Sequence, residues 1–399
     1  LLGDGKGGFA PARSYKVGDS PLSLAVADFN GDEKPDVAVP NRDSENISVL
    51  MGDGAGGLAV SSNYAVGDFP RALAAADLNR DGKLDLAVSG FPKQIAVILG
   101  DGRGRFGPPA LFEAGDGPRA VGVGDFNQDG HLDVIIGNEH SADVSLLLGD
   151  GQGRFDSPHH FKTGDGPSFL AVHDFNQDGH LDVAVVNRDS DTVSVLLGDG
   201  RGRFAAAVNY AVGRGPSGIA AGDFNQDGRM DLATANLFSA NVSILLGNGP
   251  GGFSQAVSFD TGRGPFSVVA ADFNQEGNLD LATANTGAAS VSLLLGDGRG
   301  RFAAPHDLVA GETAAVLVAA DFNQDNYADI AVVNFGSATV AVFTGDGRGG
   351  FAPAVHYGAE AATRGVVAAD FNGDGKPDLA VANRDSDTVS ILINSYGGR

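Results

Sequence analysis

Two strings that recur along the whole chain, and four short apolar runs in each repeat, predict an all-β fold: an eight-bladed β-propeller of four-stranded blades. The first string, Asp-Phe-Asn-x-Asp-Gly-x-x-Asp with single substitutions, recurs every 48 or 49 residues, and the second, Gly-Asp-Gly-x-Gly-x-Phe, keeps the same period. One such unit is too small to bury a core alone, so neighbouring units must stack. The eight copies of the first string open at Asp28, Asp77, Asp125, Asp174, Asp223, Asp272, Asp321 and Asp370.

The fifth repeat illustrates the four runs that we expect to be strands. Clusters of Gly, Asp, Asn and Pro separate these runs, and no run has the length or the 3.6-residue period of a helix. The first run is rich in Ala, Val and Gly, and such small side chains suit the crowded axis of a propeller. The four runs cover residues 217–224, 230–235, 241–246 and 256–259.

The two ends of the chain predict how the ring closes. The last repeat stops where its fourth run should begin, and a run without a blade of its own lies at residues 9–17. We therefore expect the N-terminal strand to complete the last blade, which also protects sheet edges. This gives one propeller over residues 1–394 and a disordered tail at 395–399. Because the chain begins at Leu1 without a leader, we expect it to be part of a longer protein.

The composition excludes several classes of function. The chain has 399 residues, 60 of them Gly, a formal net charge of -23 and no Cys. Disulfides, zinc-thiolate sites and cysteine nucleophiles are therefore excluded, and no run approaches the 18 apolar residues of a membrane span. The negative charge argues against nucleic-acid binding. We expect a monomer with no nucleic-acid partner and no membrane insertion.

The first string has the ligand pattern of a calcium site. Numbered from its opening aspartate, it places oxygen-bearing side chains at positions 1, 3, 5 and 9 and a backbone carbonyl at position 7. Calcium prefers six to eight such oxygens, and a glycine at position 6 permits the turn. We call each copy an acidic loop and expect up to eight Ca²⁺. The candidate ligands are Asp28, Asn30, Asp32, Lys34, Asp36, Asp77, Asn79, Asp81, Lys83, Asp85, Asp125, Asn127, Asp129, His131, Asp133, Asp174, Asn176, Asp178, His180, Asp182, Asp223, Asn225, Asp227, Arg229, Asp231, Asp272, Asn274, Glu276, Asn278, Asp280, Asp321, Asn323, Asp325, Tyr327, Asp329, Asp370, Asn372, Asp374, Lys376 and Asp378.

Two other kinds of acidic loop have similar sequences. An EF-hand needs flanking helices and an acid at position 12, where this chain has apolar residues such as Val39 and Val88. Plain Asn-Asp-Gly turns with solvated carboxylates stay open as the alternative. Eight bound Ca²⁺ would reduce the net charge of -23 to about -7, an ordinary value for a folded domain.

Three loops depart from the pattern. Glu33 replaces Gly at position 6 of the first loop, Glu276 replaces Asp at position 5 of the sixth, and Asn326 replaces Gly at position 6 of the seventh. A β-carbon at position 6 strains a left-handed turn, although Asn tolerates it best. We therefore expect the first loop to be the weakest calcium site.

No catalytic constellation is evident. The Gly-Asp-Gly string lacks the Lys-Ser/Thr pair of a phosphate loop, and no Gly-x-Ser-x-Gly or His-Glu-x-x-His occurs. We therefore expect no enzymatic activity. If the chain is more than a scaffold, its function should lie where the repeats differ, on the face of the ring opposite the acidic loops, which we call the variable face. Its loops include Asn41-Arg42-Asp43, Phe69-Pro70-Arg71, Phe91-Pro92-Lys93, Pro118-Arg119, Ser168-Phe169, Asn187-Arg188-Asp189, Leu237-Phe238, Pro265-Phe266, Phe335 and Asn383-Arg384-Asp385. The alternative that stays open is that the Phe side chains of these loops pack between blades and that their Arg-Asp pairs are solvated.

The acidic loops and the upstream strings Phe9-Ala10-Pro11-Ala12 and Phe351-Ala352-Pro353-Ala354 resemble the FG-GAP (or VCBS) repeat over essentially the whole chain. That family includes the integrin α-subunit propeller, propeller lectins and domains of bacterial surface proteins. The resemblance implies calcium between the first and second strands of a blade and an extracellular location. Members usually have seven blades, whereas this chain has eight repeats.

These observations favour a non-enzymatic, calcium-binding β-propeller that acts as a binding or adhesion module. We expect it to be secreted or on a cell surface, bacterial, and to bind a carbohydrate or protein ligand on the variable face. Two alternatives stay open. One is a polysaccharide lyase or hydrolase on a calcium-stabilised propeller, and the other is an amplified or engineered repeat scaffold with no selected ligand.

Overall fold

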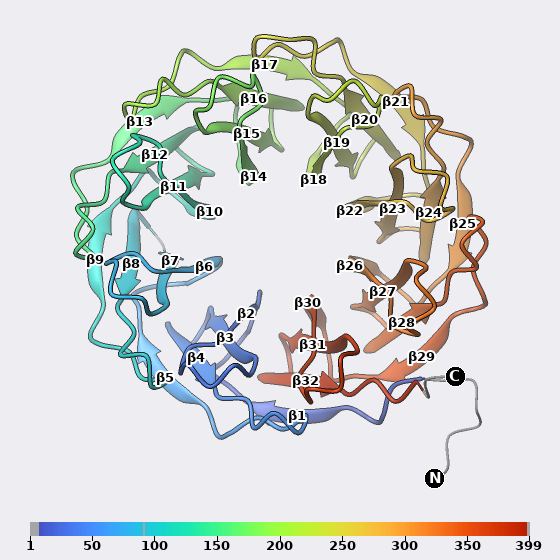
Figure 1. The fold of residues 1–399 in the computed structure, drawn as a ribbon, viewed down its shortest axis with the longest axis horizontal. Coiled ribbons are helices and arrows are strands. Elements are labelled where there is room, and N and C mark those ends of the chain that lie inside the picture. The colour runs from blue at the N-terminus through green and yellow to red at the C-terminus, as the bar shows by residue number, and fades with distance from the viewer. Residues whose placement is uncertain (1–7, 91, 397–399) are drawn as a thin grey trace.

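The computed structural model, which describes residues 8–90 and 92–396, is a closed ring of eight four-stranded antiparallel sheets (Figure 1). The expected eight-bladed all-β propeller is confirmed, and no helix occurs in the described part of the chain. Accordingly, none of these residues forms a helix that could cross a membrane. In the first seven blades the chain runs outward from the axis through four consecutive strands, and in the last blade through three.

The innermost strands line the axis, and small residues dominate them as expected. These strands are β2 (Ala25–Ala27), β6 (Leu73–Ala76), β10 (Pro118–Gly124), β14 (Pro167–His173), β18 (Pro216–Gly222), β22 (Pro265–Ala271), β26 (Ala314–Ala320) and β30 (Thr363–Ala369).

The second and third strands of each blade form its core. The second strands are β3 (Asp36–Asn41), β7 (Asp85–Gly90), β11 (Asp133–Asn138), β15 (Asp182–Asn187), β19 (Asp231–Asn236), β23 (Asp280–Asn285), β27 (Asp329–Asn334) and β31 (Asp378–Asn383). The third strands are β4 (Asn46–Leu50), β8 (Gln94–Ile98), β12 (Asp143–Leu147), β16 (Thr192–Leu196), β20 (Asn241–Leu245), β24 (Ser290–Leu294), β28 (Thr339–Phe343) and β32 (Thr388–Leu392).

The outer strands are short and half exposed. They are β5 (Ser62–Ala65), β9 (Ala110–Glu113), β13 (His159–Lys162), β17 (Val208–Ala211), β21 (Val257–Asp260), β25 (His306–Val309), β29 (Val355–Gly358) and, for the last blade, β1 (Arg13–Lys16).

The hydrophobic core lies between the blades. Every residue of β19 is buried, and Ala233 and Ile244 of the fifth blade form one cluster with Leu281 and Leu294 of the sixth. The middle strands are apolar on both faces because each blade is covered on both sides by its neighbours. Edge-to-face aromatic pairs continue this contact, as between Phe224 and Phe302 at 5.8 Å.

The N-terminal segment closes the ring. In β1, Arg13 pairs with Ile391 of β32, and Phe9 bridges Asn394. The Phe9 ring lies 5.5 Å from that of Phe322, an edge-to-face contact like those between the other blades. The closure predicted from the sequence is therefore confirmed.

The predicted disordered tail needs correction at its start. Ser395 donates its amide to the Gly8 carbonyl at 2.7 Å, and Tyr396 is 7% exposed with its ring 6.4 Å from that of Phe9. Residues 395 and 396 are thus held by the same N-terminal segment that closes the ring. Residues 397–399 of the predicted tail, and residues 1–7 of the predicted propeller, lie outside the described residues.

Candidate functional site

The acidic loops connect the first and second strands of the blades, and their side chains bind their own backbone. In the fifth loop, Asp223 Oδ1 accepts the Asp227 amide at 3.1 Å and Oδ2 accepts the Gly228 amide at 2.8 Å. Asn225 Oδ1 accepts the Asp227 amide at 3.0 Å, and Asp227 Oδ1 accepts the Arg229 amide at 2.9 Å. Positions 1, 3 and 5 therefore face the inside of one tight loop.

The aspartate at position 9 has a structural role that the sequence did not reveal. Asp231 is fully buried; its Oδ2 accepts the Phe224 amide at 2.8 Å and its Oδ1 accepts the Gly247 amide at 2.7 Å. It thereby joins the acidic loop to the Gly-Asp-Gly turn of its own blade. In the last blade Asn394 stands at the position equivalent to Gly247, and its backbone amide donates to Asp378 Oδ1 at 2.6 Å.

Burial raises the pKa of each position-9 aspartate. The pKa of Asp231 rises to about 6 because desolvation outweighs the two amide hydrogen bonds, and the charges of Asp227 and Asp223 repel the ionised form. The pKa of Asp329 rises to about 7, again mainly through burial.

The residues at position 7 present their side chains to the aspartate at position 5. Lys34 Nζ lies 3.3 Å from Asp32, and Arg229 Nη1 lies 3.2 Å from Asp227. These are exposed ion pairs, which contribute little to stability. The calcium pattern requires only the backbone carbonyl of position 7, not its side chain.

Across residues 8–90 and 92–396, no group of three or more His, Asp or Glu side chains converges closely enough to hold a metal ion. The oxygen-only donor set still fits calcium, since a carboxylate oxygen can accept a hydrogen bond and coordinate a cation with different lone pairs.

The sixth loop provides a further test of this fit. Glu276 replaces Asp at position 5, and Asp272 Oδ1 is buried without a hydrogen-bond donor. In the fifth loop the equivalent oxygen accepts an amide. A hollow of about 580 Å³ beside this loop is lined by positions 3, 5 and 7, namely Asn274, Glu276 and Asn278. An unpaired buried carboxylate oxygen next to other oxygen donors suits a cation.

Positions 4 and 6 both adopt left-handed backbone conformations. Glu33 and Asn326, which replace the position-6 glycine, have φ of 64° and 69°. Position 4 has a positive φ as well, for example 58° at Gln128 and 57° at Gln226, which the sequence analysis missed. The signal was available, because the first and eighth loops carry Gly at this position, Gly31 and Gly373.

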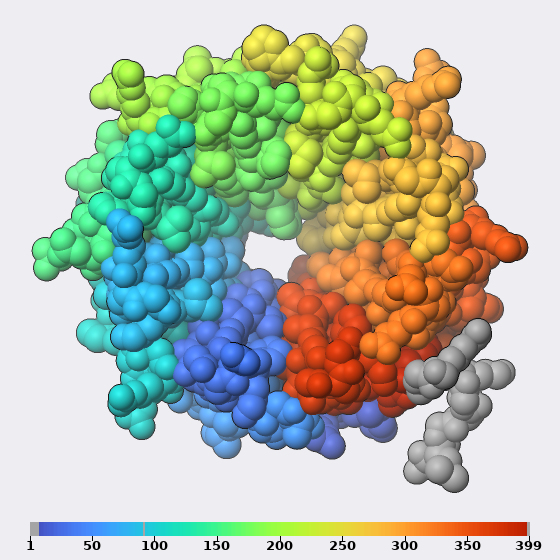
Figure 2. All heavy atoms as spheres, viewed as in Figure 1, coloured from blue at the N-terminus to red at the C-terminus, as the bar shows by residue number. Residues whose placement is uncertain are grey.

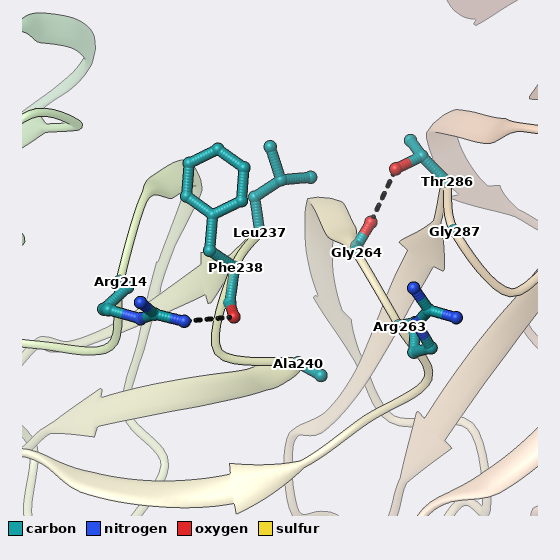
Figure 3. A pocket seen from close by; sticks show the side chains of 8 residues that line it. All are labelled: Arg214, Leu237, Phe238, Ala240, Arg263, Gly264, Thr286 and Gly287. Atoms are coloured by element: carbon teal, nitrogen blue, oxygen red, sulfur yellow. Dashed lines mark hydrogen bonds between the residues drawn. The ribbon is translucent and has the colours of Figure 1, made fainter.

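The variable face carries an open pocket of about 620 Å³ between the fifth and sixth blades. In Figure 3, Leu237 and Phe238 rise from the loop between β19 and β20, and Gly264 and Thr286 form the opposite wall. Phe238 is 64% exposed. Arg214 Nη2 stabilises the loop that carries Phe238 by donating to the Phe238 carbonyl at 3.4 Å.

Other aromatic side chains of the variable face also reach solvent. Phe69 and Phe169 are 38% and 40% exposed, and the Arg42 guanidinium lies 5.5 Å from the Phe69 ring centre. Phe91, which we also expected on this face, lies outside the described residues. Of the residues expected on this surface, Leu237 and Phe238 therefore line one pocket, whereas Phe69 and Phe169 lie on other blades.

Comparison with known proteins supports the repeat assignment. The sequence model of the family described as FG-GAP-like repeat matches residues 28–88, 77–136, 125–185, 174–234, 235–283, 276–332 and 321–381. No curated protein matches the sequence.

Solved structures share the fold at low sequence identity. The Dos1 propeller aligns over 98% of this chain and 96% of its own, with a TM-score of 0.63 and 12% identity. An Agrocybe aegerita lectin that recognises non-reducing terminal N-acetylglucosamine aligns over 91% and 100%, with a TM-score of 0.54 and 19% identity. A Bacillus licheniformis rhamnogalacturonan lyase aligns over 97% and 75%, with a TM-score of 0.56 and 13% identity. At such identities the likeness concerns the fold alone.

Proposed function

The chain belongs to the FG-GAP-like repeat family, and from this premise we propose that it is a non-enzymatic, calcium-binding propeller that binds carbohydrate through its variable face. The observation that carries the ligand proposal is the pocket beside Phe238. An exposed aromatic ring next to polar groups in an open pocket is suited to stacking against a sugar ring and hydrogen bonding to its hydroxyls.

Calcium would be held by the acidic loops. Aspartates at positions 1 and 5, the asparagine at position 3 and the carbonyl at position 7 supply hard oxygen ligands, and the buried position-9 aspartate adds a carboxylate. A bound cation would neutralise the repulsion between these carboxylates and tie the two inner strands of a blade together. Its role here is structural, because the loops lie on the face opposite the Phe238 pocket.

The proposed location is extracellular. Sites built on a few exposed carboxylates bind calcium weakly, and such sites fill where calcium reaches millimolar concentrations, as in extracellular modules. A secreted or surface-attached module with a rigid ring and an adaptable loop face is consistent with an adhesion role.

The pocket proposal can be tested with immobilised glycans. Calcium-saturated protein is applied to a panel of neutral and acidic oligosaccharides, and Phe238→Ala is compared with Leu111→Ala, which removes a 49% exposed side chain from the outer strand β9. We expect binding that Phe238→Ala weakens at least tenfold and that Leu111→Ala leaves unchanged.

Two outcomes would contradict the carbohydrate proposal. One is the absence of binding to every glycan by folded, calcium-saturated protein. The other is glycan binding that Phe238→Ala and Leu111→Ala affect equally. A protein captured specifically through the variable face, without glycan binding, would instead favour a protein ligand.

A further inference from the structure

Three arginines occupy equivalent positions at the variable-face end of the inner strands. In β10, Pro118 pairs with Asn138 and Ala120 pairs with Gly137, so Arg119 is the extra residue of a bulge. The same register shift in β30 leaves Arg364 as the extra residue. Bulges redirect a side chain relative to the ladder. Arg71 follows the proline at the corresponding place in the second blade.

Two of these three guanidinium groups share one carboxylate. Glu139 is 14% exposed and accepts Arg119 Nη1 at 2.6 Å and Arg71 Nη1 at 2.9 Å. Within the described chain, Arg364 has no carboxylate at ion-pair distance. The Arg364 guanidinium lies 4.8 Å from the centre of the Phe335 ring, and the Arg384 guanidinium lies 5.4 Å from the same centre. The buried Arg364 Nε donates to no acceptor.

Two of these arginines stand beside the axis on different blades. Arg119 belongs to the third blade and Arg364 to the eighth, each at the bulge of the innermost strand. Burial lowers the pKa of Arg364, and repulsion by Arg384 and Arg119 adds to this shift, whereas attraction by Asp385 opposes it. Figure 2 shows that the ring is open at its centre.

Three other arginines of the variable face are locally neutralised. Arg42, Arg188 and Arg384 each lie near the aspartate that follows them in sequence, at 3.9, 3.3 and 2.7 Å. The three inner-strand arginines and Glu139 therefore leave an excess of two positive charges at the axial opening of a chain whose net charge is -23. Such a local reversal of sign attracts anions.

We infer that the axial opening of the variable face binds an acidic oligosaccharide through the carboxylates of uronate residues. Guanidinium groups pair with carboxylates through two parallel hydrogen bonds. Arg71, Arg119 and Arg364 belong to blades two, three and eight, so a ligand that carries several carboxylates can pair with more than one of them.

An exposed aromatic ring favours a sugar chain over an acidic peptide. Phe169 at the start of β14 is 40% exposed and offers an apolar face against which a sugar ring stacks. The Phe335 ring is already contacted by the Arg364 and Arg384 guanidinium groups. This inference rests on the proposed binding role of the variable face and specifies the ligand class at a site separate from the Phe238 pocket.

The inference can be tested by calorimetric titration of the calcium-saturated protein with a galacturonate tetramer, a neutral galactose tetramer and poly-L-glutamate. Arg364→Gln is compared with Arg201→Gln, which removes the same charge from an exposed residue on the opposite face. Both variants keep all eight acidic loops, so calcium carried by the uronate affects them equally. Circular dichroism confirms that each variant is folded.

We expect the uronate to bind at least tenfold more tightly than the neutral tetramer. Arg364→Gln should weaken uronate binding about tenfold, whereas Arg201→Gln should leave it unchanged, and affinity should fall as salt rises. The inference is overturned if the uronate binds no better than the neutral sugar, if both variants behave alike, or if poly-L-glutamate binds as tightly. If neutral glycans still bind through Phe238, only this inference fails and the proposed function survives.

Discussion

Gln226 Nε2 donates to the Gly277 carbonyl at 2.9 Å and so joins the acidic loop of the fifth blade to that of the sixth. The same hydrogen bond recurs from the position-4 glutamine of five consecutive loops to position 6 of the next loop. The other four pairs are Gln128 with Gly179, Gln177 with Gly228, Gln275 with Asn326, and Gln324 with Gly375. The acidic loops of blades three to eight therefore form a connected chain.

Replacing Gln226 tests both the hydrogen bond and the left-handed backbone beneath it. Gln226→Ala loses the bond and keeps a β-carbon at φ 57°, so we expect the free energy of unfolding to fall by about 1 kcal/mol. Gln226→Gly loses the same bond but removes the steric strain, and should cost less. Urea unfolding measures both, and equal losses would contradict the strain argument.

The different roles of positions 5 and 9 predict different mutant behaviour. Asp231→Ala leaves the buried Phe224 and Gly247 amides without acceptors, so we expect a loss of about 2–4 kcal/mol even in calcium-free buffer. Asp227→Ala should cost less than about 1 kcal/mol without calcium but abolish one calcium site. Chemical unfolding with and without calcium, together with counting of bound metal, separates the two. Similar stability losses for both variants in calcium-free buffer would contradict this assignment.

The position-9 aspartates also predict an unusual pH dependence. The pKa of Asp231 rises from its usual value of 3.8 to about 6 in the folded chain, so the native state binds more protons than the unfolded state between these values. Stability from this group is fully present below about pH 4 and is lost as the pH rises through about 6.

Because the pKa is raised at the equivalent aspartate of every blade, the effects should add. In calcium-free buffer, we expect Tm to increase on the order of 10 °C when the pH falls from 7 to 5. Saturating calcium should reverse or remove the trend, since it favours ionised carboxylates. Differential scanning calorimetry provides the measurement. A Tm that falls between pH 7 and pH 5 without calcium would show that the buried aspartates do not control stability.

The sequence was sufficient to predict the ring because the acidic-loop string and the Gly-Asp-Gly string recur at a nearly constant spacing. Blade number, strand number per blade and closure by residues 9–17 all follow from the period and from the incomplete last repeat. The first strand of the fifth repeat was expected at 217–224 and occurs as β18, Pro216–Gly222. Eight similar units leave little freedom in how the chain can pair.

Other features could not be predicted because one residue type serves two purposes. An aspartate at position 9 is compatible with metal binding and with capping of buried amides, and only the fold brings Asp231 beside the Gly247 amide. Likewise, the meeting of Arg71 and Arg119 on Glu139 depends on how two blades are placed around the axis. Such contacts join residues from different repeats, which a repeat pattern does not specify.

The first acidic loop should gain calcium affinity when its turn residue is restored. Glu33 adopts φ 64°, a conformation that a glycine adopts without steric cost. We expect Glu33→Gly to tighten calcium binding at this loop several-fold, and Asn326→Gly to have a smaller effect because Asn tolerates left-handed conformations. Native mass spectrometry during a calcium titration measures the occupancy. Unchanged affinity in Glu33→Gly would show that backbone strain does not weaken the site.

Phe9 anchors the N-terminal segment to the last two blades and so contributes to ring closure. Its ring is 6% exposed and lies 5.4 Å from that of Tyr357, so Phe9→Ala should lower the free energy of unfolding by about 3 kcal/mol. Phe302→Ala, a matched loss of a buried ring between the fifth and sixth blades, should cost a similar amount.

The two variants should differ in where the structure opens. In Phe9→Ala the N-terminal segment loses its main apolar anchor, so hydrogen exchange should accelerate in β1 and β32. In Phe302→Ala the chain is continuous on both sides of the lost contact, and exchange in β1 and β32 should stay as in the unmodified protein. If Phe9→Ala leaves exchange in these two strands unchanged, the closure is held by the strand pairing of Arg13 with Ile391 and its neighbours rather than by the aromatic contact.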